Sequence, residues 1–435
     1  MNTLYGDGVH DDAPAIQALL DSGASEIALP APKKHYAIGS TLRIHGGQTL
    51  RLGSTAEIRL LPGSNCCMLA NAAPGTGEEH IAVVGGIWNR DNQNQAPNPW
   101  AREPAPGEEY PSSTTGPDYY WASPLACIDA AAKDGAEIPR EKQSISSAQA
   151  NTFIMCFTHV KYFTLRDLAF KDPTNFAFFG AYLTHFTVEN IRFDFNHGNP
   201  YATNMDGIHL EGGCRFGHIR NLQGACYDDL LALNADDFIH GPIEDIEVDG
   251  IFSGNCHSAV RMLSTKSWIR RVTISNVHGT FYQYCVGITR FHYREEERDC
   301  LGLYDDIALR NIFAAKAPRH SFYGKDNGYV FSLVWIEQSL HINRLHIEHI
   351  SRLEEVEPIP TILVQPHTQI GTLSIAHASQ KKKIAAPITF LRNEGSIQRL
   401  FLRDIDLGGD TLLRGDGYVA CLYADEQALE VLSGS

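Results

Sequence analysis

Positive charge, long apolar runs and closely spaced cysteines are all scarce in this sequence of 435 residues. Lys and Arg number 36 against 51 Asp and Glu, and the net charge of −15 argues against nucleic acid or an anionic membrane as the main partner. No run reaches the roughly 20 apolar residues that a membrane-spanning helix needs. The ten cysteines include no CxxC pair. This excludes a zinc ribbon or a dithiol redox site and predicts buried thiols in a reducing compartment.

Targeting signals and helix signals are scarce as well. The first residues, MNTLYGDGVHDDAPAIQ, have no basic n-region and no apolar h-region. We therefore expect a cytoplasmic protein, or a secreted or periplasmic one if a leader has been removed. One amphipathic helix is predicted at residues 12–22, with Asp12 as its cap, Pro14 in its first turn and Gly23 after its end.

Short strands with a repeated motif dominate the rest of the chain. Alternating apolar residues are followed by Asn, Asp, Gly or His and then by one more apolar residue, from FTLRDL to LFLRDI. The polar position falls at Asp167, Asn190, Asn221, Gly250, Asn276, Asn311, His349, His377 and Asp404. Spacings of 23 to 38 residues predict a parallel β-solenoid with a bend at the polar position and loops of variable length. A β-propeller is the alternative, but its blades need about 40 residues and four strands each. We expect a single all-β domain over residues 1–435.

Residues 89–151 interrupt this rhythm. The segment is rich in Pro, Gly and polar residues and also carries Trp100, Tyr110 and Trp121. A simple surface excursion is one interpretation, because long loops are usually mobile. Disordered segments, however, are poor in aromatic residues, and flat rings suit the apolar faces of sugars. We expect an inserted loop region over a substrate cleft.

Three carboxylates stand out in the stretch from NMDG to YDDLL. Asp206 precedes Asp228 and Asp229 by 22 and 23 residues, about one short coil. Residues one coil apart in a parallel solenoid stack about 4.8 Å from each other, so the three should meet on adjacent rungs. Like charges that close favour a protonated acid beside an ionised base, as in inverting glycosidases, whose carboxyls lie about 6.5–9.5 Å apart. Asp is also a common turn residue, and we adopt that interpretation for Asp236 and Asp237.

The motifs resemble those of glycoside hydrolase family 28, the polygalacturonases and their relatives. NMDG and YDDLLALN are similar to the family's NTD and DDC-apolar-A-apolar-N motifs. YGDGVHDDAPAIQALLDSG is similar to the N-terminal cap of many pectinase-type β-helix proteins. The resemblance implies a right-handed parallel β-helix that needs no metal or cofactor. It also implies Asp228 as the general acid, with Asp206 and Asp229 as bases that activate water for inversion.

The same resemblance suggests substrate-binding residues further along the chain. His257 in NCHSAVRMLS matches the histidine of the family's GHG motif. The family's RIK motif, whose cations hold the substrate carboxylate, falls on Gly287 and Thr289. A neutral or differently charged sugar is therefore expected in place of galacturonate. Arg261 or Arg290 could supply a cation from a neighbouring position.

Two further candidates lie near Asp206. His209 alternates with Glu211 along the expected strand, so one face could present both to the cleft. Asn204 is the other candidate for substrate contact, with a turn role as its alternative.

The expected function is exo-acting, inverting hydrolysis of an oligosaccharide by a polygalacturonase-like enzyme. A polysaccharide lyase or fructotransferase on the same solenoid is one alternative. A lyase would need a cation and a basic residue stacked with the carboxylates, and the sequence offers no such base. A non-catalytic carbohydrate-binding solenoid is the other alternative.

Overall fold

The computed structural model describes residues 3–98, 152–199, 202–291, 297–318 and 331–433, so most of the expected inserted segment 89–151 lies outside the described residues. Two compact units divide the chain. Unit 1 comprises Met1–Leu231 with Phe238–His240, and unit 2 comprises Ala232–Asp237 with Gly241–Ser435. Among the described residues, none of the helices has the length and apolar character needed to cross a membrane.

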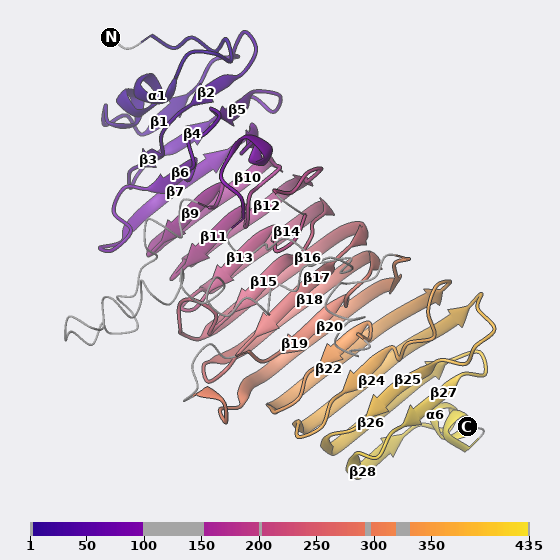
Figure 1. Cartoon of the computed structure of the whole chain (residues 1–435). Helices are drawn as coiled ribbons and strands as arrows, with labels where there is room; N and C mark the ends of the chain where they lie inside the picture. Colours follow the sequence, from indigo (N-terminus) through magenta and orange to yellow (C-terminus); the bar gives the residue numbers. More distant parts are fainter. Residues whose placement is uncertain (1–2, 99–151, 200–201, 292–296, 319–330, 434–435) are drawn as a thin grey trace. The chain divides into compact units, whose positions relative to one another are not determined.

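Unit 1 contains two parallel sheets whose strands stack one coil above the next (Figure 1). The first sheet contains, in spatial order, β1 (Glu26–Ala28), β4 (Thr49–Arg51), β7 (Glu78–Val84), β10 (Val160–Lys171), β12 (Thr184–Asp194) and β14 (Arg215–Ala225). A side branch joins this sheet at β10: β8 (Ile87–Asn89) pairs with β10 and with β5 (Glu57–Leu60), and β5 pairs with β2 (Tyr36–Ile38). The second sheet contains β3 (Leu42–Ile44), β6 (Leu69–Asn71), β9 (Met155–Thr158), β11 (Phe178–Ala181) and β13 (Ile208–Glu211).

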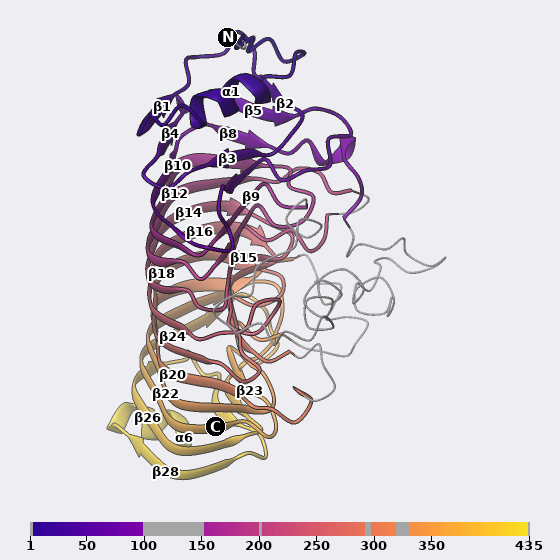
Figure 2. The ribbon, with the colours of Figure 1, turned by 90° about the vertical axis from the view of Figure 1, so that its left-hand side faces the viewer.

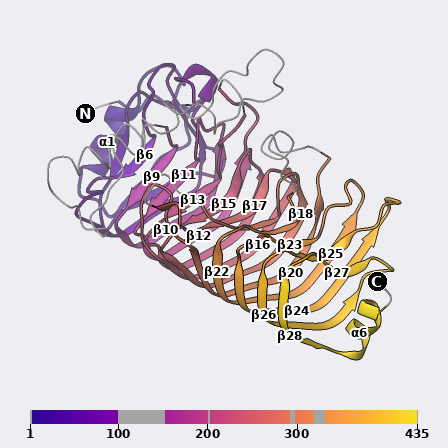
Figure 3. The same ribbon diagram turned by 60° about the horizontal axis from the view of Figure 1, so that its bottom comes forward.

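Unit 2 repeats this arrangement. Its first sheet contains β16 (Ile243–Cys256), β18 (Trp268–Phe281), β20 (Gly302–Lys316), β22 (Leu340–Glu354), β24 (Gln369–Lys382), β26 (Ser396–Asp406) and β28 (Tyr418–Ala424). Its second contains β17 (Ser258–Leu263), β19 (Val286–Thr289), β21 (Val334–Ile336), β23 (Ile362–Val364), β25 (Thr389–Asn393) and β27 (Thr411–Arg414). Helix α6 (Glu426–Ser433) packs beside β26 and β28 (Figure 3). The parallel β-helix expected from the sequence is confirmed.

The polar position of each sequence repeat is a left-handed bend. In unit 1, φ is 58° at Asp167, 57° at Asn190 and 51° at Asn221. The equivalent positions of unit 2 also have positive φ: Gly250, Asn276, Asn311, His349, His377 and Asp404. Gly, Asn, Asp and His adopt this conformation most readily. The amide of Asn190 donates to Asp167 Oδ1 at 2.8 Å, and that of Asn221 to Asn190 Oδ1 at 2.8 Å, so side chains form a ladder between coils.

The bend also explains the apolar pattern of each repeat. In β12, Phe186 and Val188 are buried before the bend, and Ile191 and Phe193 are buried after it. A straight strand alternates with a period of two and would turn the second pair to the opposite face. The left-handed residue Asn190 resets this alternation, so all four side chains point into the core.

Helix α1 (Ala13–Leu20) lies against β3 at the start of unit 1 (Figure 2) and is shorter than the predicted 12–22. Asp12 occupies its N-cap position, but its carboxylate makes no capping hydrogen bond. Asp12 Oδ1 instead accepts the backbone N–H of Tyr5 at 2.6 Å, and Oδ2 accepts that of Ala37 at 3.2 Å. The predicted side-chain cap is therefore wrong: the carboxylate, fully buried, holds the N-terminal loop against β2.

Replacing Asp12 with alanine is expected to lower the free energy of unfolding by about 3 kcal/mol. The backbone N–H groups of Tyr5, Gly6 and Ala37 would lose a buried acceptor, and each such loss typically costs about 1–3 kcal/mol. Thermal unfolding followed by circular dichroism measures the change. Asp21→Ala removes an exposed carboxylate after the same helix and should have a much smaller effect. Equal effects of the two substitutions would contradict this account of Asp12.

Lys316 at the end of β20 is a buried amine in unit 2. It is 4% exposed, and its Nζ donates to the backbone carbonyls of Tyr282 and Phe331 at 3.2 Å and to that of Gln283. Burial, followed by the nearby charge of Arg352, lowers the pKa of Lys316 to about 7.

This lowered pKa makes stability depend on pH. Between pH 7 and 10 the unfolded chain holds a proton at Lys316 that the folded chain has lost. The contribution of Lys316 to the free energy of unfolding therefore rises with pH, by at most about 1.4 kcal/mol per pH unit. Urea denaturation at pH 6 to 9 should show a larger gain for the wild type than for Lys316→Met. Parallel pH profiles for the two proteins would show that the folded chain keeps this proton.

Candidate active site

Two successive rungs of unit 1 carry the three aspartates predicted from the sequence. Asp206 lies just before β13, and Asp229 begins β15 (Asp229–Asn234). The backbone N–H of Gly207 donates to the carbonyl of Asp229 at 3.0 Å, which places the two segments on adjacent rungs. Carboxylate oxygens of Asp228 and Asp229 lie within 4.8 Å of each other. The one-coil spacing predicted from the sequence therefore does bring Asp206 and the Asp228–Asp229 pair to neighbouring rungs.

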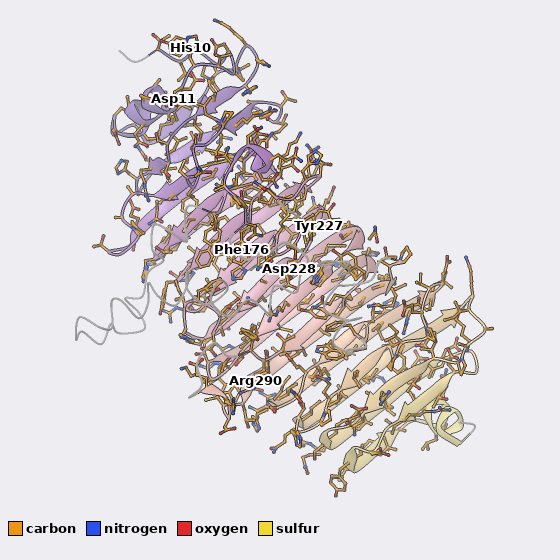
Figure 4. The ribbon with its side chains drawn as sticks, in the orientation of Figure 1. His10, Asp11, Phe176, Tyr227, Asp228 and Arg290 are labelled. Atoms are coloured by element: carbon orange, nitrogen blue, oxygen red, sulfur yellow. The ribbon has the colours of Figure 1, made fainter. Side chains whose placement is uncertain are left out.

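The three carboxylates differ in their access to solvent. Asp206 is 3% exposed and Asp229 is 1% exposed, whereas Asp228 is half-buried. Figure 4 labels Asp228 with its neighbour Tyr227, which is also half-buried. A molecule that arrives from solvent can thus touch Asp228 more readily than either of the other two.

His209 on β13 lies between two acids. Its Nδ1 is 2.6 Å from Asp206 Oδ2, and its Nε2 is 2.7 Å from Glu211 Oε1. The expected placement of His209 and Glu211 on one face is confirmed by these contacts. The face is not open, however, because the side chain of His209 is only 1% exposed.

Phenyl rings cover this histidine. The ring of Phe176 (labelled in Figure 4) stacks on that of His209 with centroids 4.0 Å apart, and those of Phe179 and Phe238 lie at 5.5 and 6.0 Å. A role for His209 in direct substrate contact does not fit this burial. Asn204, the other candidate nearby, has φ of 49°, and its carbonyl accepts the amide of Asn175 at 2.6 Å, which supports the alternative role in a turn.

Unit 2 holds the remaining candidates. His257 is 2% exposed, with Nδ1 3.2 Å from Ser258 Oγ and its ring edge-on to that of Tyr282. Arg290 (Figure 4) directs its guanidinium to the backbone carbonyls of residues 297, 298 and 300. Arg261 on β17 is half-buried, and its Nε donates to Thr289 Oγ1 at 3.2 Å. The guanidinium of Arg290 is thus engaged by backbone carbonyls, and Arg261 is the better placed of the two cations to meet a ligand.

The positions where the family places its Arg and Lys carry no cation here. Gly287 pairs with Arg261 across β17 and β19. A Cβ at Gly287 would lie 2.6 Å from the ring of Tyr284, so no side chain fits unless that ring moves. The hydroxyl of Thr289 donates to the carbonyl of Met262 at 3.0 Å. Among the described residues, these two positions therefore provide no pair of cations.

Asp236 and Asp237 have the turn roles predicted for them. Asp236 Oδ2 accepts the backbone N–H groups of Thr265, Lys266 and Ser267 at 2.9, 2.8 and 2.6 Å, and Oδ1 accepts the hydroxyl of Ser267 at 2.6 Å. Asp237 Oδ2 accepts the amide of Asn234 at 2.9 Å.

Side chains that could hold a metal ion lie in unit 1. The carboxylates of Asp228 and Asp229 offer ligand atoms within 4.8 Å of each other, as do His209 and Glu211. Both ring nitrogens of His209 face carboxylate oxygens at hydrogen-bonding distance.

Comparisons with known proteins find similarity in structure only. No protein-family model and no curated protein matches the sequence. A family 28 exopolygalacturonase of Yersinia enterocolitica matches with a TM-score of 0.57 and 13% identity, over 96% of this chain and 76% of that one. An exopolygalacturonase of Thermotoga maritima gives a TM-score of 0.47 with 14% identity, over 92% and 89% of the two chains. The surface adhesin PfbA of Streptococcus pneumoniae gives 0.43 with 13% identity, over 97% and 89%. The chain therefore has a polygalacturonase-like, right-handed parallel β-helix fold.

Proposed function

We propose that this protein is a glycoside hydrolase that cleaves a glycosidic bond at the end of an oligosaccharide, with inversion at the anomeric carbon. One observation carries the proposal: Asp206, Asp228 and Asp229 lie on adjacent rungs of unit 1, and Asp228 is the partly exposed member. The fold alone would not suffice, since one fold hosts many functions.

The three carboxylates act as one general acid and two bases in the proposed hydrolysis. Asp228, in its protonated form, donates its proton to the leaving oxygen as the glycosidic C–O bond breaks. Asp206 and Asp229 accept a proton from the water whose oxygen bonds to the anomeric carbon from the opposite face. One water is consumed, and the acid and the base each exchange one proton. The low exposure of the two bases keeps bulk water away, which strengthens their electrostatic effect.

The substrate proposed is a sugar without a carboxylate at the cleavage site. A uronate is best held by charged hydrogen bonds from Arg or Lys. Gly287 and Thr289 provide none, and the ring of Tyr284 fills the space beside Gly287. Arg261 and His257 remain candidates for contact with the sugar, and Asn204 and Arg290 are weaker ones.

Reducing-sugar release from a panel of neutral and acidic oligosaccharides tests the proposal. The wild type should release sugar from neutral members, with EDTA making no difference, and product size shows whether cleavage starts at a chain end. Loss of activity in EDTA, or an unsaturated product that absorbs in the ultraviolet, would favour a lyase instead. If the protein releases sugar from no member of the panel, the result would favour a carbohydrate-binding module without catalytic activity.

A further inference from the structure

The contacts of His209 constrain its protonation. Its two ring nitrogens face carboxylate oxygens of Asp206 and Glu211 at 2.6 and 2.7 Å. A neutral imidazole has a single N–H and could satisfy only one of them. Two hydrogen bonds require either an imidazolium between two carboxylates or a neutral ring with one protonated acid. Both arrangements hold two protons and a net charge of −1.

The surroundings favour the charged ring. Glu211 Oε2 accepts the backbone N–H groups of Phe238 and Ile239 at 3.2 and 3.1 Å. Hydrogen bonds of this kind stabilise the ionised form of a carboxylate. The ring of Phe176 stacks on His209 at 4.0 Å with an interplanar angle of 9°, and the face of an aromatic ring attracts a cation. An anionic Glu211 beside an imidazolium satisfies each of these contacts.

We propose that His209 and Glu211 are positioning residues that hold the Asp206 carboxylate in its ionised form and in a fixed orientation. The inference rests on the proposed function, in which Asp206 acts as a base. Asp206 is 3% exposed, so little solvent is available to stabilise its charge. The imidazolium supplies that stabilisation, and Glu211 keeps the ring charged. The side chains of the three residues are 4%, 1% and 0% exposed, which isolates this chain of hydrogen bonds from bulk water.

The substitution Glu211→Gln removes the negative charge of this side chain but keeps its shape and its hydrogen-bonding positions. The new amide oxygen can still accept the N–H groups of Phe238 and Ile239, and its NH₂ can donate to His209 Nε2. The ring then keeps its Nδ1–H bond to Asp206 but loses its positive charge. We expect kcat for an active oligosaccharide to fall by about ten- to a hundredfold, with KM within about a factor of two. The control is Glu189→Gln, a partly exposed acid on β12 of the same unit, which should leave both constants unchanged.

Nuclear magnetic resonance of protein labelled with ¹⁵N in histidine supplies a second readout that needs no substrate. The His209 signals are identified by their absence in His209→Gln. Both ring nitrogens should carry protons in the wild type, and only Nδ1 should do so in Glu211→Gln. A single protonated nitrogen in the wild type would overturn the proposal even if Glu211→Gln fails to fold.

The kinetic outcomes distinguish this inference from the proposed function. An unchanged kcat in Glu211→Gln, or a loss fully explained by unfolded protein, would overturn the positioning role while hydrolysis stands. No sugar release by the wild type would overturn the proposed function and the positioning role with it. The NMR result would then still decide whether the ring is charged.

Discussion

Asp228→Asn is expected to lower kcat for an oligosaccharide about a thousandfold and to leave the fold intact. Asparagine has nearly the same shape as aspartate but has no acidic proton to give to the leaving oxygen. General acid catalysis typically contributes about 10²- to 10⁴-fold to a rate. Because Asp228 is half-buried in the bend just before β15, the amide should fit without repacking. Initial rates of reducing-end release, at equal concentrations of folded protein, measure the effect.

Two controls sharpen this prediction. Asp167→Asn changes an exposed bend residue of unit 1 to the residue found at the equivalent position Asn190, and should leave the rate unchanged. With an aryl glycoside whose leaving group needs no protonation, the loss in Asp228→Asn should shrink, whereas that in Asp206→Asn should persist. If Asp228→Asn kept more than about a tenth of the wild-type rate on both substrates, Asp228 would not be the acid.

Asp236→Ala is expected to be among the most destabilising single changes in unit 2, at about 4 kcal/mol. The substitution leaves the N–H groups of Thr265, Lys266 and Ser267 without their buried acceptor, and also removes a bond from the Ser267 hydroxyl. Each bond to a charged group is worth about 1.5–3 kcal/mol, and the turn can recover part of the loss by relaxing toward water. Chemical denaturation gives the change in the free energy of unfolding.

Asp245→Asn is the control for Asp236. The Asp245 carboxylate pairs with the guanidinium of Arg271 at 2.6 Å on the surface of the same unit. Asp245 has φ of 58°, a conformation that asparagine also tolerates. Exposed ion pairs contribute about 0–1 kcal/mol, so this variant should unfold near the wild-type midpoint. Similar losses for Asp236→Ala and Asp245→Asn would show that the buried turn does not depend on the Asp236 carboxylate.

Much of the fold is predictable from local sequence because its signals are local. The residues at Asp167, Asn190 and Asn221 are those that tolerate positive φ, and their spacings equal the coil lengths of 23 and 31 residues. The side-chain role of Asp12 was not predictable in this way. Its partners Tyr5 and Ala37 belong to a loop and a strand, and their tertiary bonds outcompete the helix cap.

The candidate site was predictable only in part. Period-two alternation places His209 and Glu211 on one face, and the one-coil spacing places Asp206 beside Asp229. Period-two alternation shows which side chains share a face of a strand, but it does not show whether other side chains cover that face. The covering rings, Phe176 and Phe238, are each about one coil away along the chain, so their contact with His209 depends on the coil register and on loop paths.

The anomeric configuration of the first product tests the central claim most directly. A proton NMR time course on an oligosaccharide that the protein cleaves would show the new reducing end before it mutarotates. Inverting hydrolysis by Asp206, Asp228 and Asp229 predicts a first-formed anomer opposite to that of the bond cleaved. A first-formed anomer with retained configuration, or an unsaturated sugar, would contradict the roles assigned to the three aspartates.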